Sequence, residues 1–183
     1  MGRGAILGGP IRQDRQLYEQ ILGLQAPWFV EGVELDLENG EVRVHLGHCK
    51  DAVWHCPQCD RESPLHDHTP ARNWRHLDTC QYRTVLCAAT PRTNCPEHGC
   101  LAVRLPWAEP RSRFPMLFER LAIAWLQAAS QKAVAERMGL TWDEVHGIME
   151  RAVARGLRRR GAEPIPHIGV DEKAFCAPRG TTG

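Results

Sequence analysis

The sequence Cys56-Pro57-Gln58-Cys59, together with Cys95-Pro96-Glu97-His98-Gly99-Cys100 further along the chain, decides the fold. In each segment a proline follows the first cysteine, and a second metal-binding side chain follows that cysteine after a gap of two residues. This spacing is typical of a zinc knuckle, a turn that directs two side chains to one ion while its backbone amides face the sulfur atoms and favour the thiolate. Two such turns supply the four ligands of a tetrahedral site, so the sequence predicts one zinc ion per chain.

Two residues are candidates for the fourth ligand. His98 stands at the same two-residue gap from Cys95 as Cys59 does from Cys56, whereas Cys100 needs a gap of four. Gly99 behind His98 can adopt the left-handed conformation that releases the chain. We therefore favour Cys56, Cys59, Cys95 and His98, with Cys100 as the alternative to His98. With every position filled by protein, the zinc would be structural and not catalytic.

A metal-free loop with buried thiols is the competing interpretation of this stretch. It must explain how a proline-rich segment with few apolar residues around Cys56 becomes ordered without an ion. Cys80 and Cys87 have no partner at ligand spacing, and we take both as small buried residues of the zinc-binding part.

The composition is that of an ordinary globular protein. Of 183 residues, 43% are hydrophobic and 25% charged, and the net charge of +1 excludes no class of partner. No apolar run approaches the roughly 20 residues of a membrane span, and Met1 to Pro10 has no signal-peptide core. Eight cysteines without a secretion signal favour metal ligands and free thiols over disulfides, so we expect a reducing cytoplasm and no membrane partner.

The segment before the first knuckle predicts a helix and a hairpin. Leu17, Ile21 and Leu24 recur at helical spacing between Arg12 and Leu24. Apolar and polar residues then alternate on both sides of Asn39-Gly40, the strongest short signal for a two-residue hairpin turn. We assign residues 1–47 to this helix and hairpin and residues 48–110 to a zinc-binding subdomain, with a strand expected from Gln81 to Ala88. Pro106-Trp107-Ala108-Glu109-Pro110 reads as the linker out of that subdomain.

From Pro115 the apolar period becomes helical. Leu117, Leu121, Ala124, Trp125 and Ala128 predict the inner face of a first helix. A second helix is expected from about Ser130 to Met138. A third begins at Thr141, where Thr141-Trp142-Asp143-Glu144 has the form of a capping box.

The second and third helices fit a helix-turn-helix, which we assign to residues 111–160. Ala135 is small where the helices would cross, and Gly139 takes the turn. The apolar positions between them are Val134, Met138, Leu140, Val145 and Ile148. A plain three-helix bundle is the alternative.

A cluster of cations favours DNA over the plain bundle. Its members are Arg151, Arg155, Arg158, Arg159 and Arg160, which we expect to contact phosphates. Thr141, Trp142 and His146 would then lie on the exposed face that meets base edges.

The last residues change character again. Gly161 to Pro166 reads as a linker, and His167 to Lys173 predicts a short strand that ends on Asp171. The predicted class is therefore α+β: a small hairpin and zinc-ribbon-like β subdomain, then an all-α helix-turn-helix bundle, then a C-terminal strand stub.

Several motifs, in order, resemble the N-terminal part of bacterial insertion-sequence transposases of the ISL3 family. They are Trp74-Arg75-His76-Leu77-Asp78-Thr79, Pro91 to Gly99, Pro106-Trp107-Ala108-Glu109, Ser112-Arg113-Phe114, Met149 to Leu157 and Gly169-Val170-Asp171-Glu172-Lys173. The resemblance implies a zinc-binding domain, a helix-turn-helix and a ribonuclease-H-like nuclease with Asp, Asp and Glu as metal-binding acids. It makes Cys56, Cys59, Cys95 and His98 the zinc ligands and Asp171 the first acid. It also implies double-stranded DNA, the terminal repeats of the element, as the partner, and leaves a homodimer open.

The sequence departs from that family after Asp171. Cys176 to Gly183 does not follow the family pattern, so we expect residues 161–183 to be the truncated start of the nuclease domain. Asp171 would then be vestigial, and Mg²⁺ would belong only to a full-length relative. We expect a DNA-binding remnant without catalytic activity of its own. The alternatives are a free-standing zinc and helix-turn-helix transcriptional regulator, and a zinc-stabilised protein-interaction module.

Overall fold

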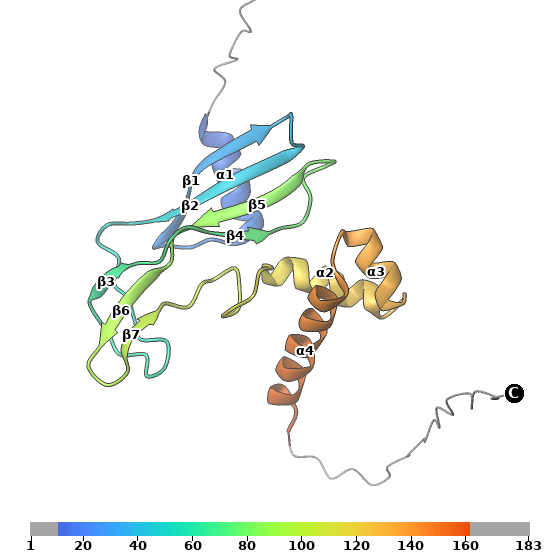
Figure 1. Cartoon of the computed structure of the whole chain (residues 1–183). Coiled ribbons are helices and arrows are strands. Elements are labelled where there is room, and N and C mark those ends of the chain that lie inside the picture. The colour runs from blue at the N-terminus through green and yellow to red at the C-terminus, as the bar shows by residue number, and fades with distance from the viewer. Residues whose placement is uncertain (1–10, 162–183) are drawn as a thin grey trace, which may run out of the picture.

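The computed structural model describes residues 11–161 and has the α+β class that the sequence predicts (Figure 1). The β-rich part comes first, and three of the four described helices follow it. In chain order the elements are α1 (Ile11–Leu22), β1 (Trp28–Asp36), β2 (Glu41–His48), β3 (Leu65–His68), β4 (Arg72–Arg75), β5 (Arg83–Ala88), β6 (Pro91–Cys95), β7 (Gly99–Ala102), α2 (Met116–Leu126), α3 (Gln131–Met138) and α4 (Trp142–Arg159). The predicted strand before Asp171 lies outside the described residues.

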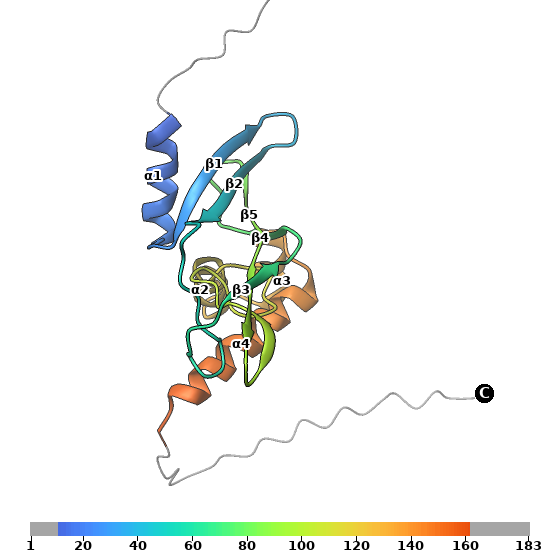
Figure 2. The same ribbon diagram turned by 90° about the vertical axis from the view of Figure 1, so that its left-hand side faces the viewer.

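The predicted hairpin is confirmed as β1 and β2. The strands pair antiparallel, with Val33 opposite Val44 and Leu35 opposite Val42, and Gly40 takes a φ of 63° in the turn. Val42, Val44 and Leu46 are all buried, as strict alternation along a half-buried strand requires. Helix α1 packs against β1 and adds Tyr18 to the same core (Figure 2).

The hairpin is extended into a four-stranded sheet of order β1-β2-β5-β4. Strand β5 runs parallel to β2 and antiparallel to β4, and it lies within the strand expected from Gln81 to Ala88. The sheet therefore joins strands from both sides of the boundary predicted between residues 47 and 48. A second, three-stranded sheet of order β3-β6-β7 carries the second knuckle at the turn between β6 and β7, and the first knuckle lies in the loop between β2 and β3.

Tryptophan rings fill the centre of the first core. Trp107 meets Trp28 edge-on at 4.8 Å between ring centroids and Trp74 at 5.7 Å. Residues 106–110 connect β7 to α2, as the predicted linker does, and Trp107 within them is 3% exposed, so this linker packs into the core. The segment packs against the sheet because burying the large aromatic side chain of Trp107 removes more apolar surface from water than most connecting loops can.

The inner face of α2 also differs from the prediction. Leu121 and Trp125 are 40% and 41% exposed, whereas Phe118, Glu119 and Ala122 are buried. Apolar residues lie nearly all round this helix, so their spacing alone does not select the buried side. The buried face also contains the charged residue Glu119, which a search for apolar spacing does not select.

None of the helices between residues 11 and 161 is both long enough and apolar enough to cross a membrane.

Candidate metal centre and nucleic-acid interface

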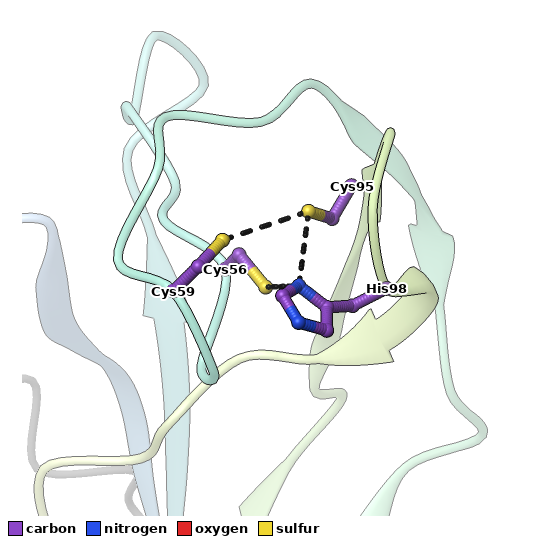
Figure 3. Close-up of side chains that lie close together, drawn as sticks. All are labelled: Cys56, Cys59, Cys95 and His98. Carbon is purple, nitrogen blue, oxygen red and sulfur yellow. Dashed lines mark hydrogen bonds between the residues drawn. The ribbon is translucent and has the colours of Figure 1, made fainter.

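The two knuckles meet, and four potential ligand atoms converge (Figure 3). The thiols of Cys56, Cys59 and Cys95 and a ring nitrogen of His98 all lie within 4.8 Å of one another. His98 Nδ1 is 3.7 Å from Cys56 Sγ and 3.5 Å from Cys95 Sγ, and the sulfurs of Cys59 and Cys95 are 3.8 Å apart. Ligands about 2.3 Å from a tetrahedral ion would be roughly 3.8 Å from one another, so the spacing fits zinc.

Local backbone geometry explains why the knuckles form. In the first, the Asp60 amide donates to the Cys56 carbonyl at 2.9 Å and the Cys56 amide donates to the Arg61 carbonyl at 2.8 Å. In the second, Cys95 ends β6 opposite Gly99 of β7, and Gly99 has the left-handed φ of 68° expected from the sequence. Each turn thus points its two side chains to the same side.

The second knuckle favours a thiolate. Burial of Cys95 opposes ionisation, but hydrogen bonds from the Glu97 and His98 amides and from the His98 ring outweigh it and lower the pKa of Cys95 to about 6. A deprotonated thiol is the form that binds a metal. At Cys59 the Arg61 amide lowers the pKa, while burial and the neighbouring thiols raise it, and the net pKa lies above the usual value.

Cys80, Cys87 and Cys100 lie outside this group of four. Cys100 is exposed on β7, where its sulfur is near His66 and Asp67 of β3. Cys80 is exposed, so the expectation of a buried residue was wrong; it occupies the turn between β4 and β5, with a φ of 57°. Cys87 is half-buried on β5, in the four-stranded sheet.

The structure contains the helix-turn-helix that the sequence predicts. Gly139 has a left-handed φ of 63° between α3 and α4. Val134, Ala135, Val145 and Ile148 are buried between the helices, and Met138 and Leu140 are half-buried against Phe118 and its neighbours. The Thr141 hydroxyl accepts from the Glu144 amide at 3.2 Å, and the Glu144 carboxylate accepts from the Thr141 amide at 2.9 Å, so the capping box is confirmed.

The residues expected to meet base edges are exposed, although one of them, Thr141, also caps helix α4. Trp142 is 57% exposed, and the His146 side chain is 56% exposed with its Nε2 3.3 Å from Glu150. The Thr141 hydroxyl is held in the capping box. Trp142 and His146 are therefore exposed at the start of α4 and take no part in the cap.

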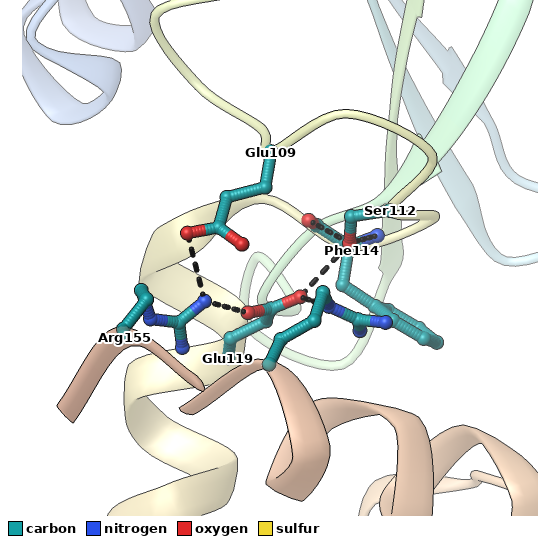
Figure 4. Close-up of polar contacts among 6 residues, drawn as sticks. Glu109, Ser112, Phe114, Glu119 and Arg155 are labelled. Atoms are coloured by element: carbon teal, nitrogen blue, oxygen red, sulfur yellow. Dashed lines mark hydrogen bonds and ion pairs between the residues drawn. The ribbon is translucent and has the colours of Figure 1, made fainter. Parts of the chain in front are cut away.

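The arginine cluster divides into two groups. Arg151 Nε donates to Glu119 at 2.8 Å, and Arg155 Nη1 lies 2.8 Å from Glu119 and 3.1 Å from Glu109 (Figure 4). Burial acts to lower the pKa of Arg155, but these two carboxylates raise it above its usual value. Arg151 and Arg155 are thus paired with carboxylates of α2 and of the segment before it, and the expectation that they contact phosphates stays a prediction. Arg158, Arg159 and Arg160 are exposed.

Glu119 is the residue that sequence reasoning missed. It is 1% exposed and also accepts from the Ser112 hydroxyl at 2.8 Å. Its one signal was a lone acid in a helix whose other residues, apart from Arg120, are apolar. Asp171, the predicted nuclease acid, lies outside the described residues, and its role stays a prediction.

Two family profiles match this chain. Residues 52–100 match the zinc-finger of transposase IS204/IS1001/IS1096/IS1165, and residues 103–153 match the helix-turn-helix domain of transposase family ISL3. The first covers both knuckles, and the second covers α2, α3 and most of α4.

Two curated relatives are similar over most of this chain. Both are described as the transposase for insertion sequence element IS1557, from Mycobacterium tuberculosis strains CDC 1551 / Oshkosh and ATCC 25618 / H37Rv, and each is 32% identical over 168 residues. The match covers 87% of this chain but 37% of each relative. No solved structure matches.

Proposed function

The chain belongs to the ISL3 family of transposases, and on that premise we propose that residues 11–161 form a zinc-stabilised unit that binds the duplex ends of an insertion element. The observation that carries the proposal is the exposed first half of α4, presented by a helix-turn-helix with a buried interior and a free basic end. Helix α4 has 18 residues, a length of about 27 Å, which is enough to cross a major groove about 12 Å wide.

The contacts with DNA divide by position along α4. Trp142 and His146 meet base edges, since both are exposed and neither is used by the cap. Arg158, Arg159 and Arg160 neutralise phosphates at the other end of the helix. Arg151 and Arg155 act indirectly: by pairing with Glu119 they fix the angle at which α4 leaves the bundle.

Zinc has a structural role in this proposal. Cys56, Cys59, Cys95 and His98 hold the ion, and since all four positions come from the protein, none stays open for water or substrate. Binding the ion joins the loop after β2 to the turn between β6 and β7, two segments that few apolar contacts hold together.

A binding experiment with the purified chain tests the DNA proposal. Fluorescence anisotropy on labelled random duplexes should show affinity that falls steeply with salt, because binding releases counterions from phosphates. Changing Arg158, Arg159 and Arg160 to Ala should weaken binding to all sequences and reduce the salt slope by about 3. His146→Ala should instead change the preference among sequences selected from a random pool.

The matched control removes three exposed cations outside α3 and α4: Lys50, Arg72 and Arg120. It changes the net charge equally and should leave the affinity within about threefold of wild type, since surface charges far from the interface act weakly through salt. Salt-insensitive binding, or equal weakening by both triple variants, would refute the assignment.

A further inference from the structure

A groove of about 350 Å³ lies between the four-stranded sheet and the turn that leads into α4. Its walls include residues of β2, β4 and β5 on one side and Gly139 and Leu140 of the helix-turn-helix on the other. Four arginines line it, Arg43, Arg75, Arg83 and Arg113, against two glutamates, Glu41 and Glu144. The groove is therefore an open site with an excess of positive charge, next to the start of α4.

Strand alternation explains why the arginines gather there. Val42, Val44, Thr84, Leu86 and Trp74 point into the core, so the residues between them occupy the opposite face of the sheet. On that face the register sets Arg43 and Arg75 on either side of Val85. Helix α1 contributes to the core on the inner face and leaves this outer face uncovered.

Not all four cations are free to bind a ligand. Arg43 Nε lies 2.7 Å from Glu41, and Arg75 pairs with Asp78 at 2.5 Å and is 15% exposed. Arg83 is exposed and has no ion pair within residues 11–161. The Arg113 side chain is 79% exposed, and its only carboxylate neighbour in the described part of the chain, Glu144, is 3.9 Å away.

We propose that this groove binds the phosphate backbone of the same duplex whose major groove α4 enters; the inference rests on the proposed function. The basic end of α4 at Arg158 to Arg160 lies near one DNA strand, and its first turn lies about 27 Å away, beside the groove. The major groove is about 12 Å wide, so the two ends of α4 reach opposite backbones.

The charge at the start of α4 supports this assignment. Asp143 and Glu144 stand in the first turn and would repel a phosphate that approached the helix there. Arg113 is the cation nearest to Glu144, and Arg83 lines the same groove. These two arginines offset the acidic turn and allow the backbone to lie against the sheet.

The test uses a duplex selected from a random pool by the wild-type chain. Arg83→Ala combined with Arg113→Ala should weaken binding roughly tenfold near 0.15 M salt and reduce the salt slope by about 2. Phosphate ethylation interference on the wild type should give two groups of contacts flanking the major groove. The double variant should lose one group, and the Arg158, Arg159 and Arg160 variant should lose the other.

Two controls accompany the double variant. Lys50→Ala with Arg120→Ala removes the same charge outside the groove and should keep both groups of contacts. Arg83→Lys with Arg113→Lys keeps the charge and should retain most of the affinity, which separates loss of cations from loss of structure.

The outcomes distinguish this inference from the proposed function. If the wild type binds and only the Arg158, Arg159 and Arg160 variant weakens, DNA binding by the helix-turn-helix stands and the groove is overturned as a contact. If the wild type binds no duplex at any salt concentration, the proposed function itself fails. Equal loss from the groove variant and the Lys50 and Arg120 control would also overturn the groove.

Discussion

His98 and Cys100 provide the sharpest prediction at the scale of single residues. His98 Nδ1 lies 3.5 Å from Cys95 Sγ, whereas Cys100 is exposed on β7 and belongs to another group of side chains. His98→Ala should therefore lower bound zinc well below one ion per chain, and Cys100→Ala should leave one ion per chain. Metal analysis of purified protein by mass spectrometry measures both. Loss of zinc from Cys100→Ala alone would contradict the ligand assignment.

Glu119 carries a second residue-scale prediction. It is 1% exposed and is the shared counter-charge of Arg151 and Arg155, which are themselves mostly buried. Glu119→Ala would leave the half-buried Arg151 without its carboxylate partner and Arg155 with Glu109 alone, and we expect a loss of about 3 kcal/mol in the free energy of unfolding. Urea denaturation measures the loss.

A neighbouring acid supplies the control. Glu136 is exposed on α3, so Glu136→Ala should change the free energy of unfolding by no more than about 0.5 kcal/mol. Equal midpoints for Glu119→Ala and wild type would show that the pairs with Arg151 and Arg155 contribute nothing to stability.

These residues also show how far sequence reasoning reaches. The knuckle residues could be singled out because Cys56 with Cys59, and Cys95 with His98, are set by local turns of fixed spacing. Glu119 could not, because its partners stand 32 and 36 residues later and only the packing of α4 on α2 brings them near. An arginine-rich helix end predicts a cluster of positive charge, but it does not show which of the arginines pair with carboxylates in the folded protein.

At the scale of elements, the three-stranded sheet should depend on metal and the four-stranded sheet should not. The three-stranded sheet and the first knuckle beside it bury mainly cysteine and small polar residues (Cys56, Ser63, Thr93 and Cys95), whereas the larger sheet buries valine, leucine and tryptophan. Removing zinc with a strong chelator should therefore speed hydrogen exchange at residues 55–62 and 94–99.

The amides of β2 and β5 serve as the internal control for that measurement. They should keep their protection after chelation, because the tryptophan-filled core contacts them directly. Uniform loss of protection across both sheets would mean that zinc supports the whole β-rich part, contrary to this division.

Local elements were predictable, and their partners were not. The hairpin followed from alternation around Asn39-Gly40, and α3 and α4 followed from Gly139 and the capping box. The parallel pairing of β2 with β5 joins strands on either side of the first knuckle, and no local pattern reports it. The basic outer face with Arg43 and Arg83 becomes a groove only once that pairing is known.

At the scale of the whole molecule, one segment joins the sheet to the helices. The Trp107 ring lies in the first core, and the Trp107 backbone carbonyl accepts a hydrogen bond from the Met116 amide at 2.8 Å. Two residues further along, Glu109 pairs with Arg155. From the other side, the Arg75 amide donates to the Arg113 carbonyl at 3.0 Å, and Leu77 packs against the core that holds Phe118. These contacts fix the helix-turn-helix against the sheet, which the groove beside α4 requires.

Trp107 and Trp142 therefore make a matched pair for the last prediction. Trp107→Ala removes a ring that is 3% exposed and should cost about 3–5 kcal/mol of the free energy of unfolding. Trp142→Ala removes a ring that is 57% exposed and should change stability by no more than about 0.5 kcal/mol while weakening duplex binding. Thermal unfolding and anisotropy on the same samples measure both properties. If Trp107→Ala left the unfolding midpoint unchanged, residues 106–110 would only connect the sheet to the helices and would not stabilise the fold. The position of α4 relative to the sheet would then be set by something other than this ring.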